Sequence, residues 1–336
     1  MGVQKYTLRI NAAQQGARLD HFLVESLPKA LGREASNGQV RKLIEAGVVS
    51  LNGRPERSVS RVLPSGARVE VVVDVARFSK SDAAKAPGKS VDRRTEFTSE
   101  QILFEDEWLI AVDKPVGLPT QPTLDESRAN LFGVLKDFLQ KRDGGSPYLG
   151  LHHRLDRDTS GVVLFTKDQK ANAGVAALFS SRVLQKTYLA LCLAGSSCPD
   201  FWEVKNYLGV VARAGKASKF GAVRSGGDPA HTTFKVIERF AGALLVEAQP
   251  HTGRTHQIRV HLAGDGRPIL GDGFYGGPAN WRPSPGVNIN IPRVMLHATS
   301  LVFCHPVTNA SVEIRSPMPA DFAACVKQLR NGAAST

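Results

Sequence analysis

The chain has 336 residues, more than a single domain of ordinary size uses, and 42% of them are hydrophobic, which is enough for a sizeable core. No apolar run approaches the ~18 residues of a membrane span, and no apolar leader opens the chain, so we expect a cytoplasmic protein without membrane contact. The four cysteines form no Cys-x-x-Cys pair, so we expect neither a zinc ribbon nor a disulfide framework. The net charge is +12, and more than half of it lies in the first 96 residues, which favours a polyanionic partner.

The first 76 residues carry the pattern of a small domain with two helices and antiparallel strands. Apolar residues at helical spacing predict one helix over 18–27 and a second over 40–46, ended by Gly47. The Asn52-Gly53 pair is a strong signal for a tight hairpin turn. Strands are predicted over residues 6–10, 48–54 and 67–75.

This order of elements resembles the small RNA-binding module named after ribosomal protein S-four, and any other small α+β domain is the alternative. The resemblance implies an RNA-binding domain over residues 1–76. The basic residues expected to be exposed and to contact RNA are Arg41, Lys42, Arg54 and Arg57. Residues 77–96 show no periodicity and are rich in Ser, Ala, Lys and Arg, so we expect a basic linker there.

A second domain is expected over residues 97–330. It opens with a strand, an acidic turn and a second strand over 101–115, which leads into the loop Lys114-Pro-Val-Gly117. Further strands are predicted over 161–166, 185–194, 232–238, 243–247, 294–304 and 310–316, and helices over 131–140, 171–179 and 320–330. Because strands outnumber helices and mostly form hairpins, we expect an α+β domain with a mixed, largely antiparallel sheet.

The segment 151–167, LHHRLDRDTSGVVLFTK, places a carboxylate on a tight loop before a buried strand. Asp156 lies between Arg154 and Arg157, and two neighbouring guanidinium groups would hold it ionised. A persistent anion suits a nucleophile or an electrostatic stabiliser better than a general acid. A surface ion-pair network that fixes the loop is the alternative.

The strand over 185–194 carries a second pair of reactive side chains. Lys186 and Tyr188 are two residues apart, so they share one face of that strand. A Lys-x-Tyr pair is common on strands and by itself predicts no function.

The segment 250–262, PHTGRTHQIRVHL, contains three histidines. We expect no metal site, because His256 and His261 are five residues apart and no acidic residue completes a ligand set. Thr255 is expected to cap a helix that begins there. The glycine-rich stretch 271–277 lacks the context of a phosphate-binding loop and is expected to form a turn beside a cleft.

Taken together and in this order, HRLDRDTSG, the Lys-x-Tyr strand and TGRTHQIR resemble the three motifs of the RluA family of RNA pseudouridine synthases. The resemblance implies the pseudouridine synthase fold, no cofactor and no metal. It implies that Asp156 is the essential catalytic residue, that Tyr188 lies against the target base and that Arg259 pairs with Asp156. Contacts with the substrate are implied for Arg154, Ile258, Lys186 and His153.

The function implied by the resemblance is isomerisation of selected uridines in RNA to pseudouridine, by a monomer. A basic module beside the catalytic domain suits a large folded RNA, so we predict large-subunit ribosomal RNA, with transfer RNA as the alternative. A non-catalytic RNA-binding protein is a second alternative. A third alternative is a hydrolase with a carboxylate nucleophile, which needs another acidic residue near Asp156. Asp158 is the only close candidate, and its place in a turn indicates that its side chain hydrogen-bonds to the backbone instead.

Overall fold

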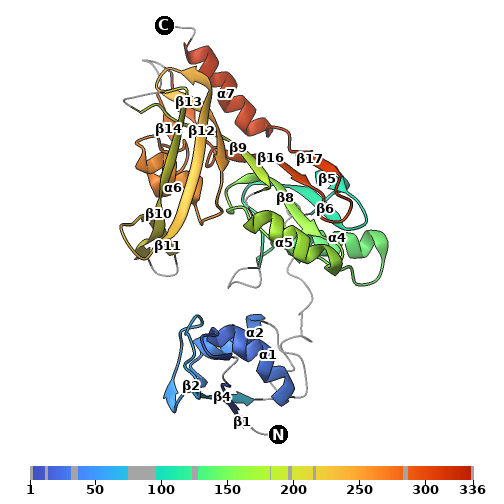
Figure 1. Ribbon diagram of the computed structural model, residues 1–336. Coiled ribbons are helices and arrows are strands. Elements are labelled where there is room, and N and C mark those ends of the chain that lie inside the picture. Colours follow the sequence, from blue (N-terminus) through green and yellow to red (C-terminus); the bar gives the residue numbers. More distant parts are fainter. Residues whose placement is uncertain are drawn as a thin grey trace. The chain divides into compact units, whose positions relative to one another are not determined.

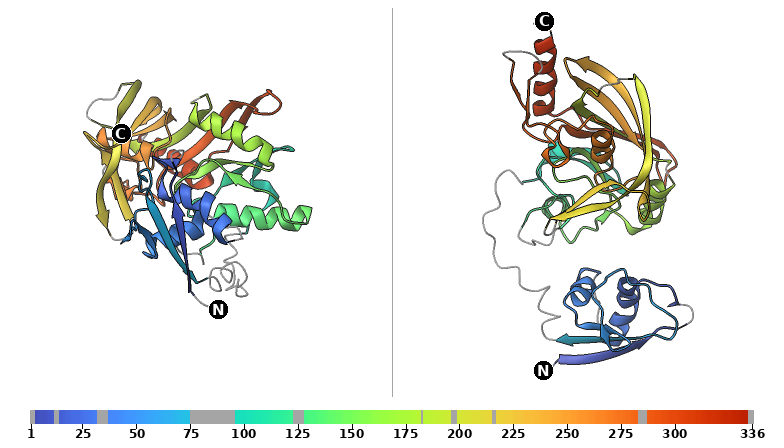
Figure 2. Two further views of the ribbon diagram at one scale, coloured as in Figure 1. Left: turned by 60° about the horizontal axis from the view of Figure 1, so that its bottom comes forward. Right: turned by 90° about the vertical axis from the view of Figure 1, so that its left-hand side faces the viewer.

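A computed structural model describes residues 3–11, 14–31, 37–74, 96–122, 128–181, 183–195, 199–214, 217–282 and 287–333. The chain divides into two compact units, Met1–Ser90 and Val91–Thr336 (Figures 1 and 2). The linker expected over 77–96 lies outside the described residues except for Glu96. The domain boundaries 1–76 and 97–330 therefore stay a prediction.

The first unit is a four-stranded antiparallel sheet with strand order β1-β4-β2-β3, covered on one face by two helices (Figure 1). Its elements are β1 (Val3–Arg9), α1 (Leu19–Leu31), α2 (Asn37–Glu45), β2 (Val49–Leu51), β3 (Arg54–Pro55) and β4 (Arg68–Asp74). Leu19, Leu23 and Leu27 lie one above another on α1 and are fully buried against Val69 and Val71 of β4. The apolar helix face predicted from the sequence is confirmed.

The hairpin between β2 and β3 turns at Asn52 and Gly53, as the sequence predicts. Both residues have positive φ, 50° and 81°, which the tight turns that match the twist of a hairpin require. The Asn52 side chain also accepts a hydrogen bond from the backbone N–H of Arg68, 2.8 Å away, which ties the turn to β4.

The second unit contains most of the secondary structure. Its elements are η3 (Ser99–Gln101), β5 (Ile102–Glu105), β6 (Leu109–Lys114), α4 (Leu131–Asp143), β7 (Gly150–Leu151), β8 (Ser160–Thr166), η4 (Gln169–Ala171), α5 (Asn172–Ser180), β9 (Gln185–Leu193), β10 (Phe201–Ala214), β11 (Ala217–Ala222), β12 (Asp228–Phe240), β13 (Ala243–Pro250), α6 (Gln257–Gly264), η5 (Gly273–Tyr275), β14 (Asn280–Trp281), β15 (Ile289–Asn290), β16 (Leu296–Cys304), β17 (Ser311–Arg315) and α7 (Ala320–Ala333).

An 11-stranded sheet organises this unit, with the order β11-β10-β12-β13-β9-β16-β8-β6-β5 and with β17 and β7 beside β16 and β8. Among the described strands, β16 and β8 form the one parallel pair. The predicted α+β class with a largely antiparallel sheet is confirmed. The long hairpin of β10 and β11 was not predicted.

Strands β6 and β8 are buried on both faces, and their side chains alternate between two layers. Ile110 and Val112 of β6 pack toward α4, whereas Leu109 and Ala111 face α5. A strand covered on both sides is apolar at successive positions, which is why VVLF of β8 shows no polar alternation. The loop that precedes β8 is thereby anchored to a rigid layer.

Gly161, the second residue of β8, is required by its surroundings. Its φ of 116° lies in a region that L side chains rarely adopt, and a Cβ built there would collide with the backbone carbonyl of Ala298 on β16. The close parallel approach of β8 and β16 therefore depends on the absence of a side chain at this position.

We expect Gly161→Ala to lower the free energy of unfolding by about 2 kcal/mol or more, from backbone strain and the clash with β16. Urea unfolding followed by tryptophan fluorescence measures this loss in the second unit, which holds all three tryptophans. Gly144→Ala is the matched control, because Gly144 has a φ of 78° and no atom near its would-be Cβ. An equal loss in both variants would show that backbone strain alone, and not the clash, is responsible.

Candidate active site

A cleft of about 530 Å³ opens in the second unit where the loop before β8, the strand β9 and the start of α6 meet. It brings together residues as far apart in the sequence as His152 and Leu296. All seven side chains predicted to be catalytic or to bind substrate line it, namely His153, Arg154, Asp156, Lys186, Tyr188, Ile258 and Arg259. Their roles toward a substrate stay predictions.

The loop that carries Asp156 is held in place by the segment after β6. The fully buried Lys114 donates from Nζ to the carbonyls of Pro115, Leu118 and Arg157, at 2.9, 2.8 and 3.0 Å. Burial lowers the pKa of Lys114 to about 7, but three acceptors match the three N–H donors of the ammonium form. The predicted Lys-Pro-x-Gly loop therefore clamps the backbone immediately after Asp156.

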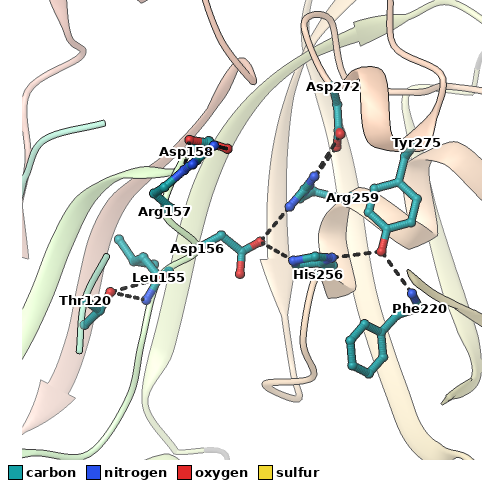
Figure 3. A network of polar contacts seen from close by, with 10 residues as sticks. All are labelled: Thr120, Leu155, Asp156, Arg157, Asp158, Phe220, His256, Arg259, Asp272 and Tyr275. Carbon is teal, nitrogen blue, oxygen red and sulfur yellow. Dashed lines mark hydrogen bonds and ion pairs between the residues drawn. The ribbon is translucent and has the colours of Figure 1, made fainter. Parts of the chain in front are cut away.

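A second attachment holds the backbone on the other side of Asp156. The hydroxyl of Thr120 donates to the carbonyl of Leu155 at 2.8 Å and accepts from its N–H at 3.1 Å (Figure 3). The backbone N–H of Gly117 adds a bond of 2.8 Å to the carbonyl of Arg157. Asp156 is thus fixed between two restrained neighbours, and no rearrangement of the loop is needed to present its carboxylate.

The carboxylate of Asp156 faces α6 rather than the arginines beside it in the sequence. Its Oδ2 lies 3.2 Å from Nη1 of Arg259 and 3.7 Å from Nε2 of His256 (Figure 3). Arg259 is itself buried and donates from Nε and Nη2 to both oxygens of Asp272, at 2.7 and 2.8 Å. One guanidinium therefore links the two carboxylates of Asp156 and Asp272.

Among the described residues, the arginine that pairs with Asp156 is Arg259; neither Arg154 nor Arg157, which were expected to hold Asp156 ionised, forms an ion pair with it. Arg157 instead forms a bidentate ion pair with Asp158, with Nε 2.8 Å from Oδ1 and Nη2 3.0 Å from Oδ2, because its side chain turns to the exposed side of the loop. The carboxylate of Asp158 is therefore engaged by a side chain and not, as expected, by the backbone. Arg154 is exposed at the lining of the cleft.

Helix α6 begins slightly later than the sequence suggested, so the prediction of Thr255 as its cap is wrong. His256 precedes the first helical residue with a φ of 57°, and its side chain caps nothing. The side chain of the buried Gln257 instead fixes the segment before the helix, because its Oε1 accepts hydrogen bonds from Thr252 Oγ1 at 2.6 Å and from the backbone N–H of Arg254 at 3.0 Å. These bonds set the start of α6, which places Ile258 and Arg259 at the cleft.

On β9, Lys186 and Tyr188 face the cleft together, as their spacing predicts. Burial first, and then the negative charge of Asp156, raise the pKa of Tyr188, so its hydroxyl stays protonated and acts as a donor rather than a base. Burial lowers the pKa of Lys186, whose Nζ lies 3.4 Å from the carbonyl of Thr252.

His153 has a structural role that the sequence did not indicate. Its Nε2 accepts a hydrogen bond of 2.8 Å from the backbone N–H of Leu164, and its ring stacks on Phe179 at 4.4 Å between centroids. Burial, then the positive charge of Lys186, lower the pKa of His153 to about 3. The ring is therefore uncharged where it lines the cleft. Its contact with substrate stays a prediction.

Sequence reasoning missed three residues of this network, His256, Asp272 and Tyr275. The stretch 271–277 does form a turn beside the cleft, as predicted, and it supplies two of them. Tyr275 lies with its hydroxyl 2.8 Å from Nδ1 of His256. An acidic and an aromatic residue inside a glycine-rich turn were the available signal, because such a turn lets the backbone approach another element closely.

The three histidines of 250–262 do not converge on a point. His251 contacts Thr233, His256 contacts Tyr275, and His261 contacts Thr232 and Asn206. Within the described residues, no group of three or more potential ligands could hold a metal ion.

The basic residues predicted to bind RNA, Arg41, Lys42, Arg54 and Arg57, are exposed in the first unit, and their role stays a prediction. In the part of the chain that the structure describes, no helix is long and apolar enough to span a membrane.

Residues 108–264 match the family described as RNA pseudouridylate synthase. Ribosomal large subunit pseudouridine synthase C of Vibrio vulnificus is 32% identical over 96% of this chain and 95% of its own length. Ribosomal large subunit pseudouridine synthase D of Nitrosomonas europaea is 30% identical over 94% of this chain and 85% of its own. The solved structure of human RNA pseudouridylate synthase domain containing 4 superposes with a TM-score of 0.55 at 26% identity, covering 69% of this chain and 94% of that one.

These matches confirm the resemblance predicted from the three motifs, since the relatives extend over nearly the whole chain and the matched segment contains Asp156, Tyr188 and Arg259. The chain belongs to the RluA family of RNA pseudouridine synthases, and it is an enzyme that isomerises uridine in RNA to pseudouridine.

Proposed function

We propose that this enzyme modifies uridines of large-subunit ribosomal RNA and that Asp156 is its essential catalytic residue. The observation that carries the proposal is the place of Asp156 in the cleft, with one carboxylate oxygen 3.2 Å from the buried Arg259. The relatives from Vibrio vulnificus and Nitrosomonas europaea, both named for the ribosomal large subunit, support the choice of RNA.

The cleft suits a uridine that has left its helix. Extruding a base costs a few kcal/mol, and the exposed Arg154 at the cleft can fill the vacated place. Ile258 and Tyr188 then offer an apolar surface and a phenol on which the uracil ring packs.

The reaction is a rearrangement within one nucleotide and needs no cofactor. Asp156 acts at the ribose or at the uracil ring, the bond between C1′ and N1 breaks, and a new bond forms between C1′ and C5. The hydrogen on C5 leaves as a proton and N1 gains one, so the composition of the nucleotide is unchanged. Tyr188 lines the same cleft as Asp156, and because burial and the charge of Asp156 raise its pKa, its protonated hydroxyl is our candidate donor in such a transfer.

A hydrolase with two carboxylates is less well supported. Asp272 is linked to Asp156 through their shared arginine, but both of its oxygens accept from Arg259 and its side chain is only 1% exposed. A second catalytic acid would have to reach water or substrate, and Asp272 is in no position to do so.

The S-four-like module over residues 1–76 is proposed to bind RNA away from the target uridine, in a cytoplasmic monomer. The exposed Arg41, Lys42, Arg54 and Arg57 supply the charges. Such contacts fix the register of a folded RNA without reading the target base.

The test of the substrate is a map of pseudouridines across total RNA, by carbodiimide adducts and primer extension, in cells with and without the gene. We expect sites in large-subunit ribosomal RNA to disappear and to return with the wild-type gene but not with Asp156→Ala. Loss of sites only in transfer RNA would overturn the substrate, and no lost site at all would overturn both parts of the proposal.

The test of the module replaces its four basic residues together by glutamine in the full chain. We expect the slope of log affinity against log salt to become shallower by about 0.7 to 0.9 for each phosphate that the module no longer neutralises. Filter binding at several salt concentrations measures the slope, with Asp156→Asn as the control that leaves it unchanged. An unaltered slope in the fourfold variant would mean that these residues do not touch RNA.

A further inference from the structure

His256 connects the carboxylate of Asp156 to the hydroxyl of Tyr275 (Figure 3). Its Nε2 lies 3.7 Å from Oδ2 of Asp156, and its Nδ1 lies 2.8 Å from the hydroxyl oxygen of Tyr275. Arg259 approaches the same Oδ2. Among the described residues, no hydrogen bond or ion pair reaches the other oxygen, Oδ1, which Figure 3 shows directed away from Arg259 and His256.

The hydrogen bonds of Tyr275 favour one of the two nitrogens of His256 as the carrier of the proton. The Tyr275 oxygen accepts from the backbone N–H of Phe220 at 3.3 Å, so its own hydrogen is free to be donated. The acceptor within reach is Nδ1 of His256. A neutral imidazole with an accepting Nδ1 has its proton on Nε2, so the N–H of His256 points at Asp156.

The imidazole is neutral because of where it lies. Burial lowers the pKa of His256, and among the charges that face it Asp156 and Asp272 raise the pKa while Arg259 and Arg154 lower it. Burial also raises the pKa of Tyr275, so its hydroxyl keeps the proton that it donates. At 3.7 Å the neutral ring faces Oδ2 from beyond hydrogen-bond distance, and it leaves the negative charge of Asp156 in place.

The ring of His256 is held in place by its aromatic neighbours. The rings of Phe220, Phe274 and Tyr275 meet it edge to face at 5.9, 6.1 and 5.6 Å between centroids. The guanidinium of Arg259 in turn stacks over the Tyr275 ring at 5.0 Å. Tyr275 therefore contacts both groups that approach Oδ2.

We propose that Tyr275 and His256 are positioning residues that, together with Arg259, hold Oδ2 of Asp156, so that Oδ1 is the oxygen that meets the target nucleotide. The inference rests on the proposed role of Asp156 in catalysis. It assigns to His256 the orientation of the carboxylate, and to Tyr275 the choice of tautomer that makes His256 a donor.

The first test needs no RNA and no activity. Nitrogen NMR of the full chain labelled at histidine distinguishes the two neutral tautomers, and the spectrum of His256→Asn identifies the signals that belong to His256. We expect the proton on Nε2 in the wild type. In Tyr275→Phe, which keeps the ring and loses only the hydroxyl, we expect a mixture of tautomers. A proton on Nδ1 in the wild type, or an unchanged tautomer in Tyr275→Phe, would overturn the inference even if the enzyme is fully active.

The second test measures steady-state kinetics. Tyr275→Phe is expected to lower kcat about tenfold with KM within about twofold, which corresponds to the loss of one hydrogen bond. His256→Asn tolerates the positive φ of 57° but lacks a donor at the Nε2 position, whereas His256→Gln restores an amide N–H near it. We expect a loss of about tenfold or more in His256→Asn and partial recovery in His256→Gln. Wild-type kcat in His256→Asn would refute the positioning role, whereas inactivity of the wild type would refute the proposed function instead.

Discussion

Asp156→Asn should lower the rate of pseudouridine formation by at least about 10³-fold while RNA affinity stays within a few-fold. Asparagine has nearly the same shape but can neither accept a proton as a carboxylate does nor attack carbon. RNA affinity should survive because binding depends on basic side chains and on the shape of the cleft. Release of tritium from RNA labelled at C5 of uridine measures the chemistry, since the hydrogen at C5 must leave, and filter binding measures affinity.

Asp158→Asn provides the matched control for this substitution. It makes the same chemical change two residues further along the loop, where the carboxylate pairs with Arg157 instead of Arg259. A half-exposed ion pair of this kind contributes little to stability, so we expect Asp158→Asn to form pseudouridine at a near-normal rate. If Asp158→Asn were as damaging as Asp156→Asn, the loop and not the individual carboxylate would be what matters; more than a tenth of normal activity in Asp156→Asn would contradict the assignment outright.

Arg259→Met is expected to lower the free energy of unfolding by about 3 to 5 kcal/mol, because it leaves the carboxylate of Asp272 buried without a partner. Asp272 is 1% exposed at its side chain and receives two hydrogen bonds from Arg259. Activity should fall as well, since Oδ2 of Asp156 loses its closest donor. Urea unfolding followed by tryptophan fluorescence and the tritium assay measure the two effects separately.

The double substitution Arg259→Met with Asp272→Asn separates stability from catalysis. Removing the buried charge should recover at least about 2 kcal/mol of the free energy of unfolding. Activity should stay low, because neither change restores a donor at Asp156. Recovery of both properties would mean that Arg259 serves only to neutralise Asp272.

The sequence predicted correctly those features that depend only on residues close together in the chain. The helix α1 follows from its apolar spacing, and the turn at Asn52-Gly53 follows from the positive φ that both residues tolerate. Lys186 and Tyr188 lie together because strand geometry places residues two apart on one face. None of these predictions needed knowledge of a distant contact.

The sequence did not predict correctly which charged side chain would pair with Asp156. Arg157 and Arg154 are nearest to Asp156 in sequence, yet the carboxylate contacts Arg259, 103 residues away. Charge spacing cannot decide this, since the direction of a side chain on a loop depends on how the loop is clamped, here by Lys114. The contacts of Asp272 with Arg259 and of Tyr275 with His256 could not be assigned from sequence spacing for the same reason.

The central place of β16 in the sheet has a consequence for how the enzyme is made. The loop of Asp156 leads into β8, whereas Tyr188 lies on β9, and in the described sheet these two strands are joined only through β16 between them. Protein synthesis proceeds from the N-terminus, so the three motifs, which all lie before residue 263, are synthesised before β16. We therefore expect a chain that ends before residue 296 to carry the reactive side chains of all three motifs without the strand that holds β8 beside β9.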